Sequence, residues 1–216
     1  YWQKTPRKPR PHFDTAEFGG YRAVLADRSF LVLIACNVVF ALCPFLLSIG
    51  LPLYATETLK TSTVVVGALF AFSSLLTICL QTLVVRLFEF CRRTRALAAA
   101  SLLWVVGCAL FAMAPLLPHV LLTPYLFGTV ALYTLAGLIA GPITTALAVA
   151  RSPAHLQGRY VAVHQFSWGL AAAIAPIMFT FLFALGPAWP WVALSGPALV
   201  TGLLMVRLES HLSAQA

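Results

Sequence analysis

Long apolar runs separated by short polar segments make up most of this chain. Two of them, at 63–85 and 96–114, flank an arginine-rich turn that reads RLFEFCRRTR. Each has about 20 residues, the length that an α-helix needs to cross a hydrocarbon core about 30 Å thick. Similar runs lie at about 29–54, 122–150 and 160–185, and in a last segment that ends near 206. The pattern therefore predicts an all-α polytopic membrane protein with six transmembrane helices.

The composition indicates lipid and not water as the main solvent. Of the residues, 61% are hydrophobic and only 9% are charged, whereas about 25% of the residues of a soluble domain are charged. The net charge of +8 could suggest a nucleic-acid partner. However, the basic residues flank the apolar runs, where the cytoplasmic excess of Lys and Arg in membrane proteins explains them. We therefore expect a lipid bilayer as partner and no nucleic acid.

The five cysteines form no CxxC pair, and none has a histidine at the spacing of a metal site. Most of them lie inside apolar runs, where cysteine behaves as a small hydrophobic residue. We expect no disulfide framework, no metal site and no cofactor.

The distribution of basic residues predicts the orientation in the membrane. Six Lys or Arg precede the first run, four lie in the turn at 86–95, two in the loop at 151–159 and one after the last run, while Lys60 alone lies on the other side. Because cytoplasmic loops carry the excess of positive charge, both termini are predicted to be cytoplasmic. The expected location is the plasma (inner) membrane.

This topology divides the chain into three parts. Residues 1–28, which contain Pro6, Pro9 and Pro11, are predicted to be an irregular cytoplasmic linker because proline interrupts helices. Residues 29–206 form the transmembrane bundle, and residues 207–216 a cytoplasmic tail. Since six spans divide into two sets of three, the second set enters the membrane with opposite polarity, as in the inverted repeats of many transporters.

Several motifs carry a resemblance to a known family. They are GALFAF at 67–72, QTLVVRLFE at 81–89, RRTRALA at 92–98, GRYVAVHQFSWGLAAAIAP at 158–176 and GPAWPW at 186–191. Together they resemble helices 7 to 12 of a bacterial major facilitator superfamily (MFS) transporter of the multidrug-efflux type, over about Tyr21 to Glu209. One departure is the missing Asp of the family's loop motif, for which Glu89 is the nearest acid, three residues after Arg86.

The resemblance implies a fold and a function. Members of this superfamily have twelve helices in two six-helix bundles, and the substrate binds between the bundles. This chain would be the C-terminal bundle, a 3+3 inverted repeat, with the end of the central loop at 1–28. The implied function is secondary active transport by alternating access, as proton-coupled efflux of small amphipathic compounds. The implied partners are an N-terminal six-helix bundle, in the same polypeptide or a separate chain, a small-molecule substrate and protons.

Two other interpretations stay open. The chain begins with Tyr1 and not with Met, which favours a processed or incomplete product, but a six-helix protein that acts as a homodimeric facilitator fits the same pattern. An intramembrane serine protease would need a Gly-x-Ser nucleophile and a histidine from another span. Ser167 and His164 lie three residues apart in one run, so we expect no enzyme and no catalytic residue.

Polar and aromatic residues recur at helical spacing within four of the runs. No Asp, Glu, Lys or Arg lies inside any of the six runs, so this chain is predicted not to bind a charged substrate by ion pairing. A polar stripe on a membrane helix faces a protein interior or a wet cavity. By the resemblance, the first, second, fourth and fifth helices line the cavity, while the third and sixth pack outside. The candidate cavity residues are Asn37, Phe40, Phe70, Ser74, Gln81, Tyr133, His164, Gln165 and Trp168.

Structural roles compete with substrate binding at these positions. Ser48, Ser74 and Thr77 are expected to bond carbonyls of their own helix, as Ser and Thr do in membrane helices. Asn37 and Gln81 are expected to join helices, at about 1 kcal/mol per hydrogen bond.

Other candidates lie near the ends or the kinks of the helices. His164 is placed about one turn from the cytoplasmic end of its run, which favours a surface or gate role. The cytoplasmic gate or loop candidates are Arg86, Glu89 and Arg92, and the hinge candidates are Pro44, Pro142 and Pro176.

Overall fold

The computed structural model describes residues 21–89 and 92–212, without the side chains of Glu89 and 208–212. All elements within these ranges are helices, which confirms the all-α prediction. In chain order they are α1 (Tyr21–Ala26), α2 (Arg28–Leu53) with a π-helical turn (Tyr54–Thr58), α3 (Thr63–Glu89), α4 (Arg93–Met113) with a 3-10 turn (Ala114–Leu116), α5 (His119–Arg151), α6 (Gln157–Leu185) and α7 (Trp189–Leu212).

Helices α2 to α7 are each long and apolar enough to cross a membrane, so the described residues contain the six predicted spans. The helices are longer than the apolar runs at several ends. For example, α3 continues from the run at 63–85 to Glu89, and α4 begins at Arg93, three residues before its run. Apolar runs predict where a helix lies in the hydrocarbon core, whereas the backbone hydrogen bonds of a helix continue into the polar interface.

Helix extends into two segments that the sequence predicted to be an irregular linker (1–28) and a cytoplasmic tail (207–216). Residues Tyr21–Ala26 form α1, with Val24 buried, because the prolines of the predicted linker all precede this segment. Asp27 then separates α1 from α2: its Oδ1 accepts a hydrogen bond from the backbone N–H of Phe30 at 3.0 Å. At the other end, α7 continues to Leu212, into the predicted tail. No proline or glycine follows Gly202 to end that helix.

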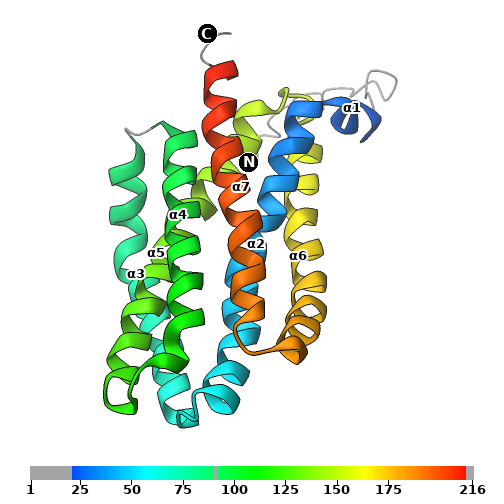
Figure 1. Cartoon of the computed structure of the whole chain (residues 1–216). Coiled ribbons are helices and arrows are strands. Elements are labelled where there is room, and N and C mark those ends of the chain that lie inside the picture. Colours follow the sequence, from blue (N-terminus) through cyan, green and yellow to red (C-terminus); the bar gives the residue numbers. More distant parts are fainter. Residues whose placement is uncertain (1–20, 90–91, 213–216) are drawn as a thin grey trace, which may run out of the picture.

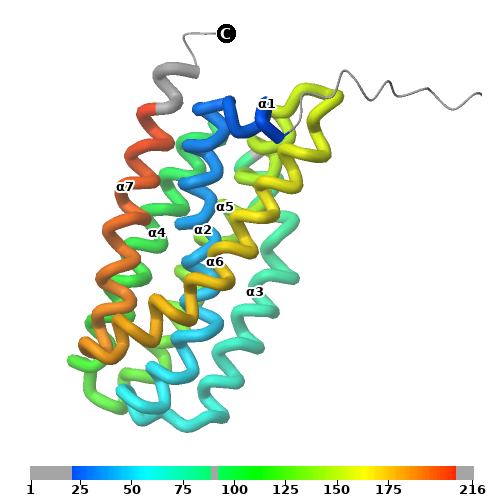
Figure 2. Tube along the Cα trace, turned by 90° about the vertical axis from the view of Figure 1, so that its right-hand side faces the viewer, coloured from blue at the N-terminus to red at the C-terminus, as the bar shows by residue number. Residues whose placement is uncertain are grey.

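The six long helices pack as a bundle with α1 lying across one end (Figure 1). Helix α4 packs against both α5 and α7, α2 packs mainly against α6, and α3 packs almost entirely against α5. Helix α1, the end of α7 and the beginnings of α4 and α6 lie at the same end of the bundle (Figures 1 and 2). The turn between α2 and α3, which contains Lys60, lies at the opposite end. Lys60 is thus separated from the other described basic residues by the length of the bundle, as the charge pattern predicted.

Aromatic side chains fill the core near the Lys60 end. Phe111 of α4 stacks on Trp191 of α7, with ring centroids 4.3 Å apart, and Tyr54 meets Trp191 edge-on at 5.5 Å. The hydroxyl of Tyr54 donates to the carbonyl of Phe111 at 2.5 Å. This cluster joins the end of α2 to α4 and α7. It buries aromatic surface while giving the phenolic hydroxyl the partner that it needs in an apolar interior.

The contact between α2 and α6 depends on a glycine. A Cβ atom on Gly50 would lie 2.5 Å from Cε2 of Phe179. Phe179 is 2% exposed and stacks on Phe183 with centroids 5.2 Å apart, so its ring has little room to move. The absence of a side chain at Gly50 therefore permits the close approach of the two helices.

The Gly50→Ala substitution is expected to destabilise the bundle by about 1–3 kcal/mol, the usual cost of overpacking a buried contact. The measurement is the apparent melting temperature of the detergent-solubilised protein. Gly67→Ala is the matched control, because a Cβ on Gly67 of α3 would meet no atom within 4 Å. Equal melting temperatures for the two variants would show that α2 and α6 do not meet at Gly50.

Candidate functional site

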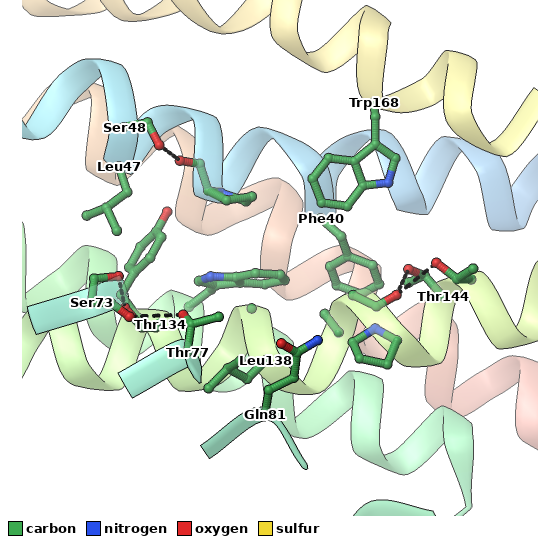
Figure 3. A pocket seen from close by; sticks show the side chains of 18 of the residues that line it. Phe40, Leu47, Ser48, Ser73, Thr77, Gln81, Thr134, Leu138, Thr144 and Trp168 are labelled. Atoms are coloured by element: carbon green, nitrogen blue, oxygen red, sulfur yellow. Dashed lines mark hydrogen bonds between the residues drawn. The ribbon is translucent and has the colours of Figure 1, made fainter. Parts of the chain in front are cut away.

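A cavity of about 900 Å³ lies between α2, α3, α5 and α6 (Figure 3). Its volume is within the range of small-molecule sites, about 300–1,000 Å³, and it is partly open to the outside of the bundle. The structure brings together eight of the nine candidate cavity residues on its wall: Asn37, Phe40, Phe70, Ser74, Gln81, Tyr133, Gln165 and Trp168. The missing one is His164.

The cavity wall is uncharged. It combines aromatic rings, such as Phe40 and Trp168 in Figure 3, with hydroxyl and amide groups. No Asp, Glu, Lys or Arg occurs among the lining residues of the described chain. Such a wall offers apolar contact, ring stacking and hydrogen bonds to a ligand, but it supplies no ion pair.

A buried pair of hydrogen bonds joins the cavity wall of α2 to α6. The Asn37 Nδ2 atom lies 2.6 Å from Ser167 Oγ, and Ser167 Oγ lies 2.5 Å from the carbonyl oxygen of His164. A serine hydroxyl carries one proton, and here it goes to that carbonyl. The Ser167 oxygen therefore accepts from Asn37, which fixes the amide with its NH₂ group toward α6. Asn37 joins two helices, as the sequence predicted.

His164 does not lie where the sequence placed it. It is 1% exposed, and its Nε2 has no hydrogen-bond partner among the described residues. Because α6 begins at Gln157, seven residues before His164, about 10 Å of helix separates the imidazole position from the helix start. The predicted surface position is therefore wrong, and His164 does not line the cavity: it is an interior residue of the bundle. A gate role stays a prediction.

The expected bonds of hydroxyl groups within a helix are confirmed at two of three positions. Ser48 Oγ donates to the Pro44 carbonyl and Thr77 Oγ1 to the Ser73 carbonyl, each at 2.9 Å. Ser74 is exposed and makes no such bond to a described residue. Gln81 was expected to join helices, but it is exposed and has no hydrogen bond to the described part of the chain. Its amide instead extends from α3 into the cavity (Figure 3).

Sequence reasoning missed several lining residues, among them Ser73, Trp104 and Thr134. Ser73 of α3 and Thr134 of α5 share a hydrogen bond of 2.8 Å between their hydroxyl oxygens. Trp104 reaches the cavity from α4, a helix expected to pack outside, with its ring centroid 5.5 Å from that of Phe40. Gly137 of α5 lies beside its ring: a Cβ there would be 3.9 Å from Trp104 Cζ2, an ordinary van der Waals distance.

The loop and hinge candidates lie in different places. Arg86 is exposed near the end of α3, and Arg92 is the residue before α4. The Glu89 side chain lies outside the described residues, so its role as a gate or loop residue stays a prediction. Pro44 and Pro142 line the cavity, and α2 and α5 continue through them. Pro176 lies in α6 away from the cavity lining.

Comparison with known proteins extends over almost the whole chain. Residues 4–215 match the family model described as Major Facilitator Superfamily. No curated protein matches the chain. The family match covers every described helix and all residues of the cavity wall.

Replacing Ser167 by Ala is expected to lower stability by about 0.6–1.7 kcal/mol, between the average and the largest value measured for hydrogen bonds between membrane helices. The substitution removes the only partner that Asn37 has among the described residues, and it leaves a buried amide unpaired. The apparent melting temperature of the solubilised protein measures the effect.

Ser195→Ala is the matched control for Ser167→Ala. Ser195 of α7 is half-buried, and its Oγ donates only within its own helix, to the Val192 carbonyl. We expect little change for this variant. If both serine variants melt at the temperature of the parent protein, the bond between α2 and α6 contributes nothing measurable.

Proposed function

The chain belongs to the Major Facilitator Superfamily, a family of membrane transporters, and on that premise we propose that it forms the C-terminal half of a secondary active transporter. The cavity between α2, α3, α5 and α6 carries this proposal. It is uncharged, large enough for a small molecule and partly open to the outside of the bundle. An N-terminal six-helix bundle that packs over this opening would complete a binding site near the middle of the membrane.

The substrate is proposed to be a small amphipathic compound. Phe40, Phe70 and Trp168 supply aromatic surface to the cavity, and Phe45 of α2 meets Trp168 edge-on at 6.1 Å. Aromatic and apolar walls with a few polar groups are typical of sites for drug-sized ligands. The sequence resemblance favours export of this substrate, as in multidrug efflux.

Proton coupling is proposed to depend on the other half of the transporter. A titratable carboxylate within the membrane is the usual proton carrier of a transporter, and none lines the cavity in the described chain. The coupling acid is therefore expected in the N-terminal bundle. Pro44 and Pro142 interrupt the hydrogen bonding of the two central cavity helices, and we propose that these helices bend there during alternating access.

The proposed transport is tested with the complete transporter, this chain joined to its N-terminal bundle, in proteoliposomes. A panel of neutral and cationic aromatic dyes should accumulate against their gradient when a pH difference is imposed, and a protonophore should abolish the accumulation. Liposomes containing the protein without a pH difference are the control. No pH-dependent flux of any dye would reject the proposal of proton-coupled efflux. Coupled flux from this chain alone, as a dimer, would favour the homodimeric alternative.

The proposed orientation, with both termini in the cytoplasm of a bacterial inner membrane, is tested by cysteine labelling. In a background with the native cysteines replaced by alanine, Lys60→Cys should react with a membrane-impermeant maleimide in intact cells. His155→Cys, in the exposed loop between α5 and α6, should react only after lysis. The opposite result would reverse the orientation.

A further inference from the structure

Most hydroxyl groups on the cavity wall already donate to the protein. Thr144 and Thr145 of α5 bond the Gly141 carbonyl at 3.0 and 3.1 Å. Tyr133 donates to the Cys43 carbonyl at 3.0 Å. Ser48 and Thr77 bond their own helices, and Ser73 is paired with Thr134, as described above. Since a hydroxyl has one proton to donate, these groups contribute little donor capacity for a ligand.

Two further polar atoms near the cavity are unpartnered but covered. They are Oδ1 of Asn37 and Nε1 of Trp104, neither of which has a partner in the described chain. Asn37 is 0% and Trp104 is 1% exposed. Both atoms lie beneath the surface of the wall, so a ligand in this conformation of the cavity does not reach them.

Two glutamine amides remain both free and accessible. Gln81 of α3 and Gln165 of α6 line the cavity, are exposed, and make no hydrogen bond to the described residues. They belong to helices on different sides of the cavity: Figure 3 shows Gln81 entering from one side and Trp168, three residues after Gln165, from the other. Each primary amide offers two N–H donors and one carbonyl acceptor. Ser74, two turns before Gln81, adds one accessible hydroxyl on α3.

We propose that Gln81 and Gln165 are the specificity-determining residues of this half of the site, and that they select an uncharged hydrogen-bonding group on an aromatic body. An amide or other neutral group with both a donor and an acceptor matches a glutamine side chain. A fixed cation gains no counter-charge from the described wall, and a purely apolar ligand leaves both amides unpaired. This inference rests on the proposed transport function and names the substrate class that it would carry.

The test measures binding to the complete transporter in detergent with three probes that share one ring system. They are 2-naphthamide, 2-isopropylnaphthalene and 2-naphthyl-trimethylammonium. The parent protein is expected to bind 2-naphthamide at least about tenfold more tightly than the hydrocarbon, because two amides each contribute a hydrogen bond. Gln81→Leu and Gln165→Leu, which keep most of the side-chain volume, should each reduce this preference by about 3- to 10-fold.

Gln157→Leu is the matched control. It is the same substitution in the same helix as Gln165→Leu, but Gln157 lies at the start of α6 and does not line the cavity. The preference for 2-naphthamide should be unchanged in this variant. A further variant, Gln81→Glu, should increase the affinity for the trimethylammonium probe, because it adds a counter-charge to an uncharged wall.

The outcomes separate the inference from the proposed function. Equal binding of 2-naphthamide and the hydrocarbon, or an unchanged preference in both leucine variants, would overturn the inference while dye flux in proteoliposomes still supported transport. A reduced preference for 2-naphthamide in only one of the two leucine variants would overturn the two-amide site. Selectivity would then depend on the glutamine replaced in that variant. If none of the probes binds and no dye is transported, the proposed function fails together with the inference.

Discussion

The structure depends on one constraint: inside a bilayer, every polar backbone group needs a partner from the protein itself. Helices meet this requirement along most of each span, with breaks at prolines such as Pro44 and Pro142, and the same requirement governs the side chains. Thr77 donates to a carbonyl of its own helix, and Asn37 reaches Ser167 on the neighbouring helix. Gln81 has no such partner among the described residues, and its amide is open to the cavity.

The sequence predicted those features of the fold that hydropathy controls. A run of about 20 apolar residues has few alternatives to a membrane helix, so the number and the approximate positions of the spans were predictable. The ends of the helices were not, because the charges that mark the membrane interface do not interrupt helical hydrogen bonding. Helix α7 accordingly runs through Arg207 to Leu212. Close contacts such as that of Gly50 with Phe179 join residues far apart in sequence, and no local pattern identifies them.

The cavity was predictable where a helical stripe defined its face. The stripe from Phe70 to Gln81 lines the cavity as its spacing indicated. The prediction failed for His164 because consecutive residues point about 100° apart on a helix, so His164 and Gln165 do not face the same side. In the structure His164 is buried inside the bundle, whereas Gln165 is exposed on the cavity wall. Trp104 was not predicted to line the cavity because its helix was assigned as a whole to the outside of the bundle. A long side chain can nevertheless pass between neighbouring helices and reach the cavity.

The same constraint gives the cavity wall its chemical character. Serine and threonine hydroxyls reach carbonyls of their own helix with little loss of side-chain freedom, so Thr144 and Thr145 both bond Gly141 and leave that part of the wall nearly apolar. A glutamine side chain is longer and extends its amide beyond the helix backbone, and Gln81 remains available in the cavity for that reason. Polarity in such a wall is thus determined less by how many hydroxyl groups line it than by which side chains are too long to bond their own helix.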